Sequence, residues 1–293
     1  MKQTTKDFLT EYICTHKYGR YVGYTFVDLF KLYSALEITD LTDISTKASD
    51  FCDFLEQSAE LITCADPHYT PRIPHKIKMV RYHFNQKFNI RDKVGQKKFA
   101  GIVNEIAPSN AHTHILDIGA SEFPYSSIIL AKDFEHTTSM DRRFYLSNTS
   151  LHNMNVDPIE TLFKDDADIS AYDFIVGRFP CSAIESIVKV CTQTNKPYFI
   201  ELCECKLPLP KALPADQSFG WQNVLPKWDP NVKIINGYAT NIDATADQLN
   251  QLLSQQALKS IFEIKSSIGT KNAVYFELSE NNFTSKPEEE PYL

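Results

Sequence analysis

The stretch His114-Ile115-Leu116-Asp117-Ile118-Gly119-Ala120-Ser121 decides the fold of this chain. An apolar run reaches an aspartate and then breaks at a glycine, and residues 122–131 follow with apolar side chains at helical spacing. A buried strand, a tight turn and a helix N-terminus form the usual ligand-binding corner of an open α/β sheet. A second acid, Asp141, ends the next strand-like run, where nucleotide sites bind ribose hydroxyls.

Strand and helix patterns alternate after residue 113, which is typical of a mainly parallel sheet covered by helices. The predicted strands cover 136–141, 154–157, 172–177, 198–203 and 233–238, and the predicted helices cover 142–150, 182–192 and 245–256. The apolar runs 260–266 and 273–278 flank a turn that contains a glycine and predict a closing hairpin. The fold class is therefore α/β, a Rossmann-like and mainly parallel sheet ending in a C-terminal β-hairpin.

The first third of the chain predicts a separate helical unit. Apolar residues recur at helical spacing over residues 4–65, so we expect an N-terminal helical domain over 1–100 and an α/β domain over 101–280. Residues 71–98 carry nine lysines and arginines against one acid, Asp92, and form either a docking patch for an anionic partner or a solvated helix face that balances an acidic domain. Residues 281–293 predict an acidic, mobile tail.

Composition indicates an ordinary globular protein of the cytoplasm. Hydrophobic residues make up 43% of the chain and charged residues 23%. No apolar run approaches the roughly 18 residues that a membrane span needs, and no signal-peptide core is visible, so no membrane partner is expected. Seven cysteines, an odd number, predict reduced thiols rather than a disulfide framework.

The order of these elements resembles that of the class I S-adenosylmethionine-dependent methyltransferases. The resemblance implies that S-adenosylmethionine lies across the tips of the first strands, with an acid after each of strands one, two and three. It assigns cofactor binding to Asp117, Gly119, Ala120, Ser121, Asp141, Asp157 and, at the fourth strand, Gly177, with Asp165 and Asp166 competing for the third acid.

The turn after the first strand departs from that family. The family pattern is acid-x-Gly-x-Gly-x-Gly, and only its first glycine, Gly119, is present here. Ala120 and Ser121 are small enough for a ligand to approach, whereas Glu122 and Phe123 are expected to narrow the site. The alternative function is therefore a methyltransferase fold that has lost catalysis and serves as a binding or interaction module.

A second, local resemblance covers residues 174–190 and 196–203. They are similar to a subset of methyltransferase-like proteins in which the fourth strand ends in His-Pro-Cys or Gly-x-His-x-Cys, and several members of this subset act on RNA. Arg178 and Phe179 stand where leucine and histidine are usual. The resemblance places Arg178, Phe179, Pro180 and Cys181 beside the transferred methyl group and puts RNA ahead of small molecules as the acceptor. Arg178 either binds an acceptor phosphate or carboxylate, or pairs with Glu201 or Glu204.

The cysteines offer two further interpretations. Cys181 follows Pro180 as the nucleophile does in cytosine-C5 methyltransferases, but the other landmarks of those enzymes are missing, which favours a structural cysteine. Cys203-x-Cys205 is spaced more closely than the cysteines of zinc knuckles, and no histidine pair flanks it. We predict no metal site.

Overall fold

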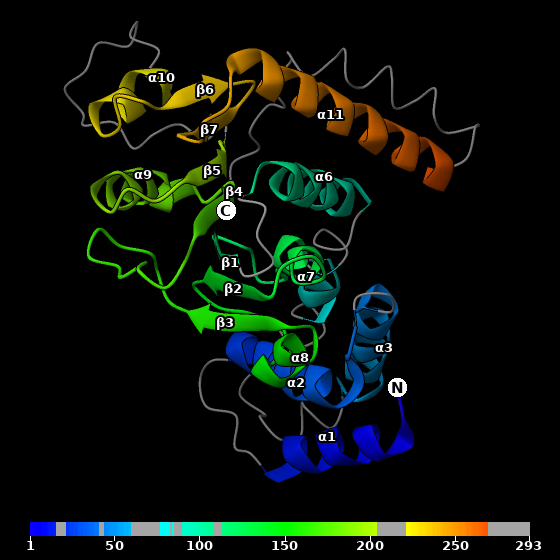
Figure 1. Ribbon diagram of the computed structural model, residues 1–293. Coiled ribbons are helices and arrows are strands. Elements are labelled where there is room, and N and C mark those ends of the chain that lie inside the picture. Colours follow the sequence, from blue (N-terminus) through cyan, green and yellow to red (C-terminus); the bar gives the residue numbers. More distant parts are fainter. Residues whose placement is uncertain are drawn as a thin grey trace, which may run out of the picture.

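The computed structural model describes residues 1–15, 22–40, 44–59, 77–82, 84, 90–107, 113–203 and 221–268. These residues contain a sheet in the order β3-β2-β1-β4-β5-β7-β6 (Figure 1). Strands β1 to β5 are parallel, and β7 runs antiparallel between β5 and β6. The strands are β1 His114–Ile118, β2 His136–Asp141, β3 Val156–Glu160, β4 Phe174–Arg178, β5 Tyr198–Glu201, β6 Lys233–Ile235 and β7 Tyr238–Thr240. The predicted Rossmann-like, mainly parallel sheet is confirmed.

Helices cover both faces of the sheet. Helices α6 (Ile90–Ile106), α7 (Tyr125–Leu130) and α11 (Ala246–Ile268) lie on one face, and α9 (Ile184–Gln193) and α10 (Trp221–Val224) lie on the other (Figure 1). Because neighbouring residues of a strand point to opposite faces, each strand feeds two cores. Ile115 and Val176 pack toward α6, whereas Leu116 and Ile175 pack toward α9. This arrangement explains why β1, β4 and β5 contain consecutive apolar residues.

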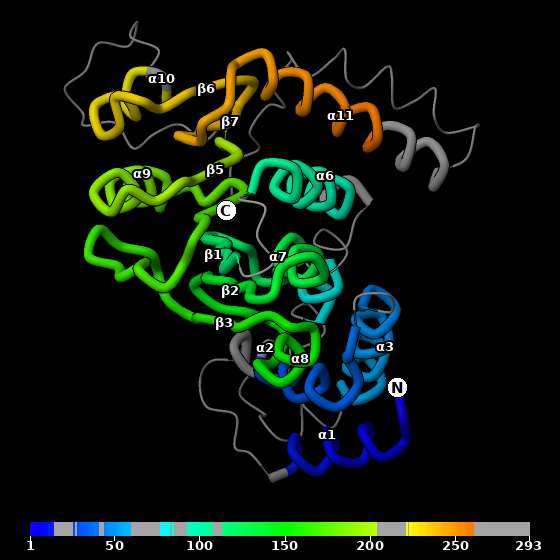
Figure 2. The backbone as a smooth tube through the Cα atoms, viewed as in Figure 1, coloured from blue at the N-terminus to red at the C-terminus, as the bar shows by residue number. Residues whose placement is uncertain are grey.

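The connections after β1 and β4 leave the sheet on opposite faces. The chain passes from β1 into α7 on one side, and from β4 through the short 3₁₀ turn Cys181–Ala183 into α9 on the other (Figure 2). Since β1 and β4 are neighbours, a crevice forms where their carboxyl ends separate, which is the position of ligand sites in open α/β sheets.

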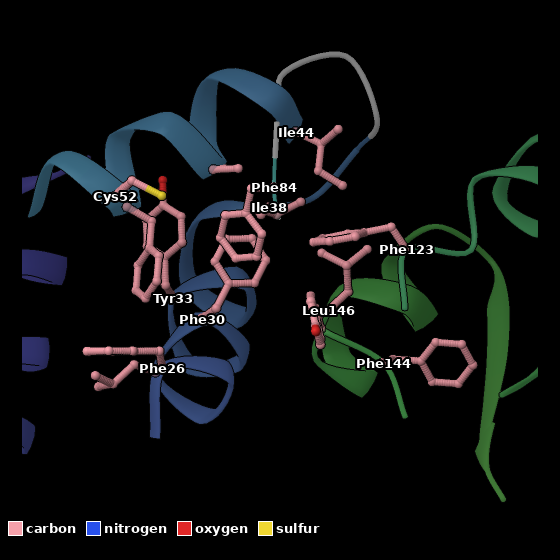
Figure 3. Close-up of a cluster of buried hydrophobic side chains, with 14 of the residues drawn as sticks. Phe26, Phe30, Tyr33, Ile38, Ile44, Cys52, Phe84, Phe123, Phe144 and Leu146 are labelled. Carbon is pink, nitrogen blue, oxygen red and sulfur yellow. The ribbon is translucent and has the colours of Figure 1, made fainter. Parts of the chain in front are cut away.

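The N-terminal helices share a core with the α/β part. Helices α1 (Gln3–Thr15), α2 (Val22–Glu37) and α3 (Ile44–Gln57) lie near α8 (Asn148–Asn153) and the β3 edge (Figure 1). Phe30 and Phe84 meet Phe123, which follows β1, with ring centroids 5.9 and 5.7 Å from that of Phe123 (Figure 3). We call Phe30, Tyr33, Phe51, Phe84, Phe123 and Tyr145 the aromatic cluster.

The domain boundary predicted between residues 100 and 101 falls inside a helix. Helix α6 runs without interruption from Ile90 to Ile106, and its buried residues Phe99 and Val103 pack against the sheet. The predicted tail, 281–293, lies outside the described residues.

The C-terminal hairpin is not formed as predicted. Residues 260–266 belong to α11, which begins after a capping box in which the Thr245 side chain accepts from the Gln248 amide and the Gln248 side chain accepts from the Thr245 amide. No proline or glycine interrupts the chain from Ala246 to Ile268, so the helix continues through the predicted strand. Residues 273–278 lie outside the described part of the chain.

The hairpin that the structure contains lies earlier, between β6 and β7. Asn236 and Gly237 join the two strands with φ angles of +48° and +82°. Two consecutive left-handed residues make the tight turn that matches the twist of paired strands. The predicted single strand over 233–238 is thus two strands. The helix predicted over 142–150 is likewise displaced to α8, where the Ser147 side chain accepts a hydrogen bond from the Ser150 amide.

Candidate functional site

A cavity of about 760 Å³ opens at the carboxyl ends of β1, β2 and β4. Its wall is formed by residues 118–122 after β1, 140–142 at the end of β2, 161–163 after β3 and 178–183 after β4, with Gln96 and Ser126 behind them. Of the residues that the sequence assigns to a site, the cavity brings together Gly119, Ala120, Ser121, Asp141, Arg178, Pro180 and Cys181.

Gly119 allows the turns after β1 and β4 to touch. Its φ angle is +72°, and a Cβ atom there would lie 2.8 Å from Cα and 2.9 Å from Cβ of Pro180. Its amide donates to the Met140 carbonyl over 2.8 Å, which ties the turn to the end of β2. Glycine is required here both by the backbone angle and by the neighbouring proline.

Ser121 occupies the position of the second glycine in the family pattern and adopts a glycine-like backbone. Its φ angle is +74°, a conformation that costs an L-residue roughly 1–2 kcal/mol. The Ser121 amide donates to Asp141 Oδ2 over 2.9 Å, and the Arg142 amide donates to Asp141 Oδ1 over 2.6 Å. These bonds fix the carboxylate at the cavity wall. Burial raises the pKa of Asp141, with Glu122 nearby adding to the effect.

Asp117 lies behind the cavity wall and does not line it. Its side chain is fully buried, and its Oδ2 accepts from the hydroxyls of Ser126 and Ser127 over 2.8 and 2.7 Å. Its other oxygen, Oδ1, has no hydrogen-bond partner in the described part of the chain. Burial raises the pKa of Asp117 to about 6, although the two serines act in the opposite direction. Asp117 therefore joins β1 to α7 from within the core.

The turn after β4 supplies the second half of the cavity. Arg178 Nε donates to Glu201 Oε2 over 3.0 Å, and the two side chains are only 17% and 16% exposed. Of the two roles that the sequence offers for Arg178, the structure therefore shows the ion pair with Glu201. The next residues are strained, with φ angles of +53° at Phe179 and +34° at Cys181. The Cys181 side chain is exposed, whereas the sequence favours a half-buried structural cysteine here. A Cβ at Gly177 would lie 2.8 Å from the Ile118 carbonyl oxygen, and Gly177 itself does not line the cavity.

The third acid of the sequence prediction lies away from the cavity. Asp157 is near the amino end of β3 and pairs with His152, with 3.2 Å between Oδ1 and Nδ1. Strand β3 continues to Glu160, which is in register with Asp141. Glu160 pairs with Lys31 of α2 and accepts from the Phe144 amide over 2.8 Å. The residue at the tip of β3 thus holds the N-terminal helices instead of lining the cavity.

Several residues that line the cavity were not predicted from the sequence. Gln96 is a polar residue on the buried side of α6, and its Oε1 accepts from the Ser126 amide over 2.9 Å. Leu162 and Phe163 lie shortly after the end of β3. A pair of apolar residues at this position is a sequence feature that could have indicated them. Glu122 lines the cavity as expected. Phe123 does not narrow it, because its ring packs in the aromatic cluster.

The structure describes only some of the residues that the remaining sequence predictions concern. Arg81 of the basic segment is paired with Asp53 and Glu56 over 2.8 and 3.0 Å, while Lys76 and Lys87 lie outside the described residues. In the described ranges, no three His, Cys, Asp or Glu side chains are grouped to hold a metal ion. The same ranges contain no helix with the length and apolarity needed to cross a membrane.

The sequence matches no family model and no curated protein. Among solved structures, the plantazolicin methyltransferase BpumL in complex with a pentazolic desmethylPZN analog and SAH is 17% identical over 52% of this chain and 60% of its own, with a TM-score of 0.29. BpumL in complex with SAH alone is 18% identical over 52% and 61%, with a TM-score of 0.28. A protein from Listeria monocytogenes, described as an S-adenosylmethionine-dependent methyltransferase, is 14% identical over 54% and 83%, with a TM-score of 0.26. The match spans about three fifths of the BpumL chains.

Proposed function

We propose that this chain binds S-adenosylmethionine in the cavity and is a methyltransferase. The cavity volume, about 760 Å³, is that of a small-molecule site, which usually measures roughly 300–1,000 Å³. Asp141 would accept hydrogen bonds from the ribose hydroxyls, since each carboxylate oxygen accepts more than one hydrogen bond. The backbone of Gly119 to Ser121 would lie along the amino-acid part of the cofactor, and residues 161–163 would contact its base.

The observation that carries this proposal is the backbone of Ser121. The sequence has lost the second glycine of the family pattern, yet Ser121 keeps the left-handed conformation that glycine would adopt there. A strained backbone persists only where the surrounding structure enforces it, and such positions cluster at functional sites. The bond from the Ser121 amide to Asp141 provides that enforcement and links the two cofactor-binding elements.

Methyl transfer requires the protein mainly to align the methyl donor with the acceptor. When bound, S-adenosylmethionine supplies a methyl group already activated on a positively charged sulfonium. Glu122 and Asp141 place negative charge on the cavity wall, where Arg142 and Arg178 also lie and where Arg178 is matched by Glu201. The turn from Arg178 to Cys181 forms the wall at which an acceptor would be held in line, with water excluded by Phe179 and Pro180.

The alternative, a methyltransferase fold without catalysis, rests on the lost glycines. Phe123 replaces the third glycine, but its ring is 3% exposed and contacts Phe30 and Tyr145, not the cavity. Its replacement of glycine therefore serves the attachment of the N-terminal helices and leaves the cavity open. This observation removes Phe123 as an obstacle to cofactor binding.

RNA, the acceptor that the sequence favours, depends on the basic segment. Within the described residues, Arg81 is neutralised by Asp53 and Glu56. Reversing Lys78 and Arg81 to glutamate and measuring RNA binding at low and high salt tests this acceptor, because phosphate contacts weaken steeply with salt.

The test of the proposed function is calorimetric titration of the protein with S-adenosylmethionine and S-adenosylhomocysteine. Asp141→Ala should weaken both by about tenfold to a hundredfold, because losing a hydrogen-bonded charged acceptor costs roughly 1.5–3 kcal/mol. Both ligands should be affected alike, since the ribose is common to them.

Asp133→Ala is the matched control. Asp133 also accepts a side-chain hydrogen bond, from Asn104 over 2.6 Å, but it lies outside the cavity and its loss should leave both affinities unchanged. Absence of binding by wild type at millimolar ligand would contradict the proposal and leave the non-catalytic alternative.

A further inference from the structure

Phe179 stands out among the cavity residues because a large apolar ring is presented to solvent there. Its side chain is 40% exposed while lining the cavity, and its φ angle is +53°. A bulky residue in the left-handed region is a conformational outlier. Leu162, on the wall that follows β3, is also exposed, at 55%. The cavity therefore has an apolar mouth in addition to its polar floor at Asp141.

The Phe179 ring is held from one side by a chain of partly buried polar groups. The Arg178 guanidinium carbon lies 4.6 Å from the ring centroid. Arg178 is fixed by Glu201, whose second oxygen accepts from the Tyr238 hydroxyl over 3.2 Å. The Tyr238 ring stacks on Phe199 with 5.1 Å between centroids, which anchors this chain in the sheet core. Aromatic surface fixed in this way is preorganised for stacking.

Helix α6 leaves room for this arrangement at one glycine. A Cβ at Gly95 would lie 2.5 Å from Nη2 and 3.1 Å from Cζ of Arg178. Glycine inside a helix lowers its stability relative to alanine. Gly95 thus gives the guanidinium its place between the helix and the Phe179 ring.

The charges around this ring do not suit an anion. The positive charge of Arg178 is matched by Glu201, and the second arginine of the cavity wall, Arg142, is accompanied there by Glu122 and Asp141. An acceptor bearing phosphate or carboxylate would meet these carboxylates at close range in a partly desolvated site. An uncharged group meets no such penalty.

We propose that the half of the cavity beside β4 binds an uncharged, planar aromatic acceptor, which stacks on Phe179 while the Arg178–Glu201 pair braces the ring. This inference rests on the proposed function, because it assigns the acceptor side of the same cavity. RNA, with its phosphates, is the competing acceptor.

The experiment compares three probes of nearly equal size by NMR titration of the full chain, with and without saturating S-adenosylhomocysteine. 4-Methylphenol is planar and uncharged, 4-methylcyclohexanol is uncharged but puckered, and 4-methylbenzoate is planar and anionic. We expect 4-methylphenol to bind best. Phe179→Ala and Phe179→Leu should each weaken its binding by roughly threefold to tenfold, and Phe179→Tyr should restore it. Affinity for S-adenosylhomocysteine should stay within about twofold in all three variants.

A pair of glycine variants in α6 tests the brace. Gly95→Ala should displace the Arg178 guanidinium and weaken 4-methylphenol severalfold. Gly101→Ala makes the same change in the same helix, but its Cβ would meet the Gln256 side-chain amide, with Oε1 at 2.9 Å, and not Arg178, so probe binding should not change. Equal affinity for the probe in the two variants would overturn the bracing role.

The other outcomes decide against the proposal. Preference for 4-methylbenzoate, equal binding of 4-methylcyclohexanol, or displacement of 4-methylphenol by a short single-stranded RNA in a salt-dependent manner would each overturn it. So would a loss of S-adenosylhomocysteine affinity in Phe179→Ala, which would assign the ring to the cofactor. If S-adenosylhomocysteine fails to bind wild type, the proposed function fails, while the titration without it still reports on the aromatic site.

Discussion

Two glycines of this chain share a left-handed backbone but differ in their surroundings. Gly119 has Pro180 within 2.8 Å of a Cβ position, whereas Gly237 has nothing within 4 Å. Gly237→Ala should therefore cost only the backbone strain, about 1–2 kcal/mol of unfolding free energy. Gly119→Ala should cost more than this, because the turns after β1 and β4 must separate, and it should abolish S-adenosylhomocysteine binding. Urea unfolding and calorimetry measure the two effects.

A result in which the two variants lose equal stability would show that Pro180 yields without cost. Retention of cofactor affinity in Gly119→Ala would remove this turn from the proposed site.

The buried carboxyl of Asp117 predicts a pH dependence of stability. Burial raises its pKa from 3.8 to about 6, so between these pH values the folded state binds more protons than the unfolded state. The contribution of Asp117 to unfolding free energy therefore falls as the pH rises through this window. Asp117→Asn lacks this effect, so its stability relative to wild type should increase by roughly 2 kcal/mol from pH 4 to pH 7. Urea denaturation across that range measures the difference.

A constant difference between Asp117→Asn and wild type over pH 4 to 7 would contradict the shifted pKa. Calorimetry on the same variant separates two roles for this residue. The family resemblance assigns Asp117 to the cofactor, but its position behind the wall predicts that S-adenosylhomocysteine affinity is largely kept.

The residues of the candidate site that were easiest to predict from the sequence are the turn glycine and the acid that lie at strand ends. Gly119 and Asp141 follow directly from the ends of β1 and β2. Asp157 was misplaced because β3 extends to Glu160, beyond the point where the apolar pattern weakens. The path of Phe123 could not be foreseen, since its ring is directed by contacts with α2, far away in the sequence.

At the scale of elements, the buried parallel strands were easier to predict from the sequence than the short strands and the last helix. Strands β1, β4 and β5 carry runs of buried apolar residues that identify them, and β2 ends at an acid, whereas the short strands β6 and β7 depend on a turn. The dipeptide Asn236-Gly237 is the strongest short-range hairpin signal and was available in the sequence. The apolar residues of 260–266 fit either a strand or a helix, and the helix continues because nothing stops α11.

The three N-terminal helices converge on one carboxylate. Glu37 at the end of α2 accepts from the Lys2 amide and the Thr5 hydroxyl of the α1 region, over 3.0 and 2.6 Å, and from Lys47 Nζ of α3 over 3.1 Å. Burial acts to raise the pKa of Glu37, but these donors outweigh it and lower the pKa from 4.5 to about 2. The Glu37 carboxylate therefore joins α1, α2 and α3.

Glu37→Gln should destabilise the fold by about 1.5–3 kcal/mol at pH 7, the usual range for hydrogen bonds to a charged group. Because the pKa is lower in the folded state, this stability is present above pH 4.5 and is lost as the pH falls toward 2. Urea unfolding at pH 7 and pH 3 should give a smaller difference between variant and wild type at the lower pH. A difference that grows on acidification would contradict the depressed pKa.

At the scale of the whole molecule, the sequence suggested two units and the packing joins them. The basic run and the prolines before residue 100 mark a change of composition, but composition does not report which buried rings meet. The aromatic cluster takes Phe30 and Phe51 from the N-terminal helices and Phe123 and Tyr145 from the α/β part. Lys31 of α2 adds an ion pair to Glu160 of β3.

Phe84 tests whether these parts unfold together. Its ring is 4% exposed and lies within 4.6 to 6.4 Å, centroid to centroid, of Phe30, Phe51, Phe123 and Tyr145. Phe84→Ala should cost about 3–5 kcal/mol, the usual range for removing a buried phenylalanine ring.

Both tryptophans, Trp221 and Trp228, lie in the C-terminal part of the chain, so their fluorescence reports on the far end of the sheet. In a single cooperative unit, Phe84→Ala lowers the urea midpoint seen by tryptophan fluorescence as much as that seen by far-UV circular dichroism. Phe8→Ala, which removes a 45% exposed ring from α1, should move neither midpoint by much. A tryptophan transition that stays at its wild-type midpoint in Phe84→Ala would instead establish two independently unfolding parts, as the sequence alone predicts.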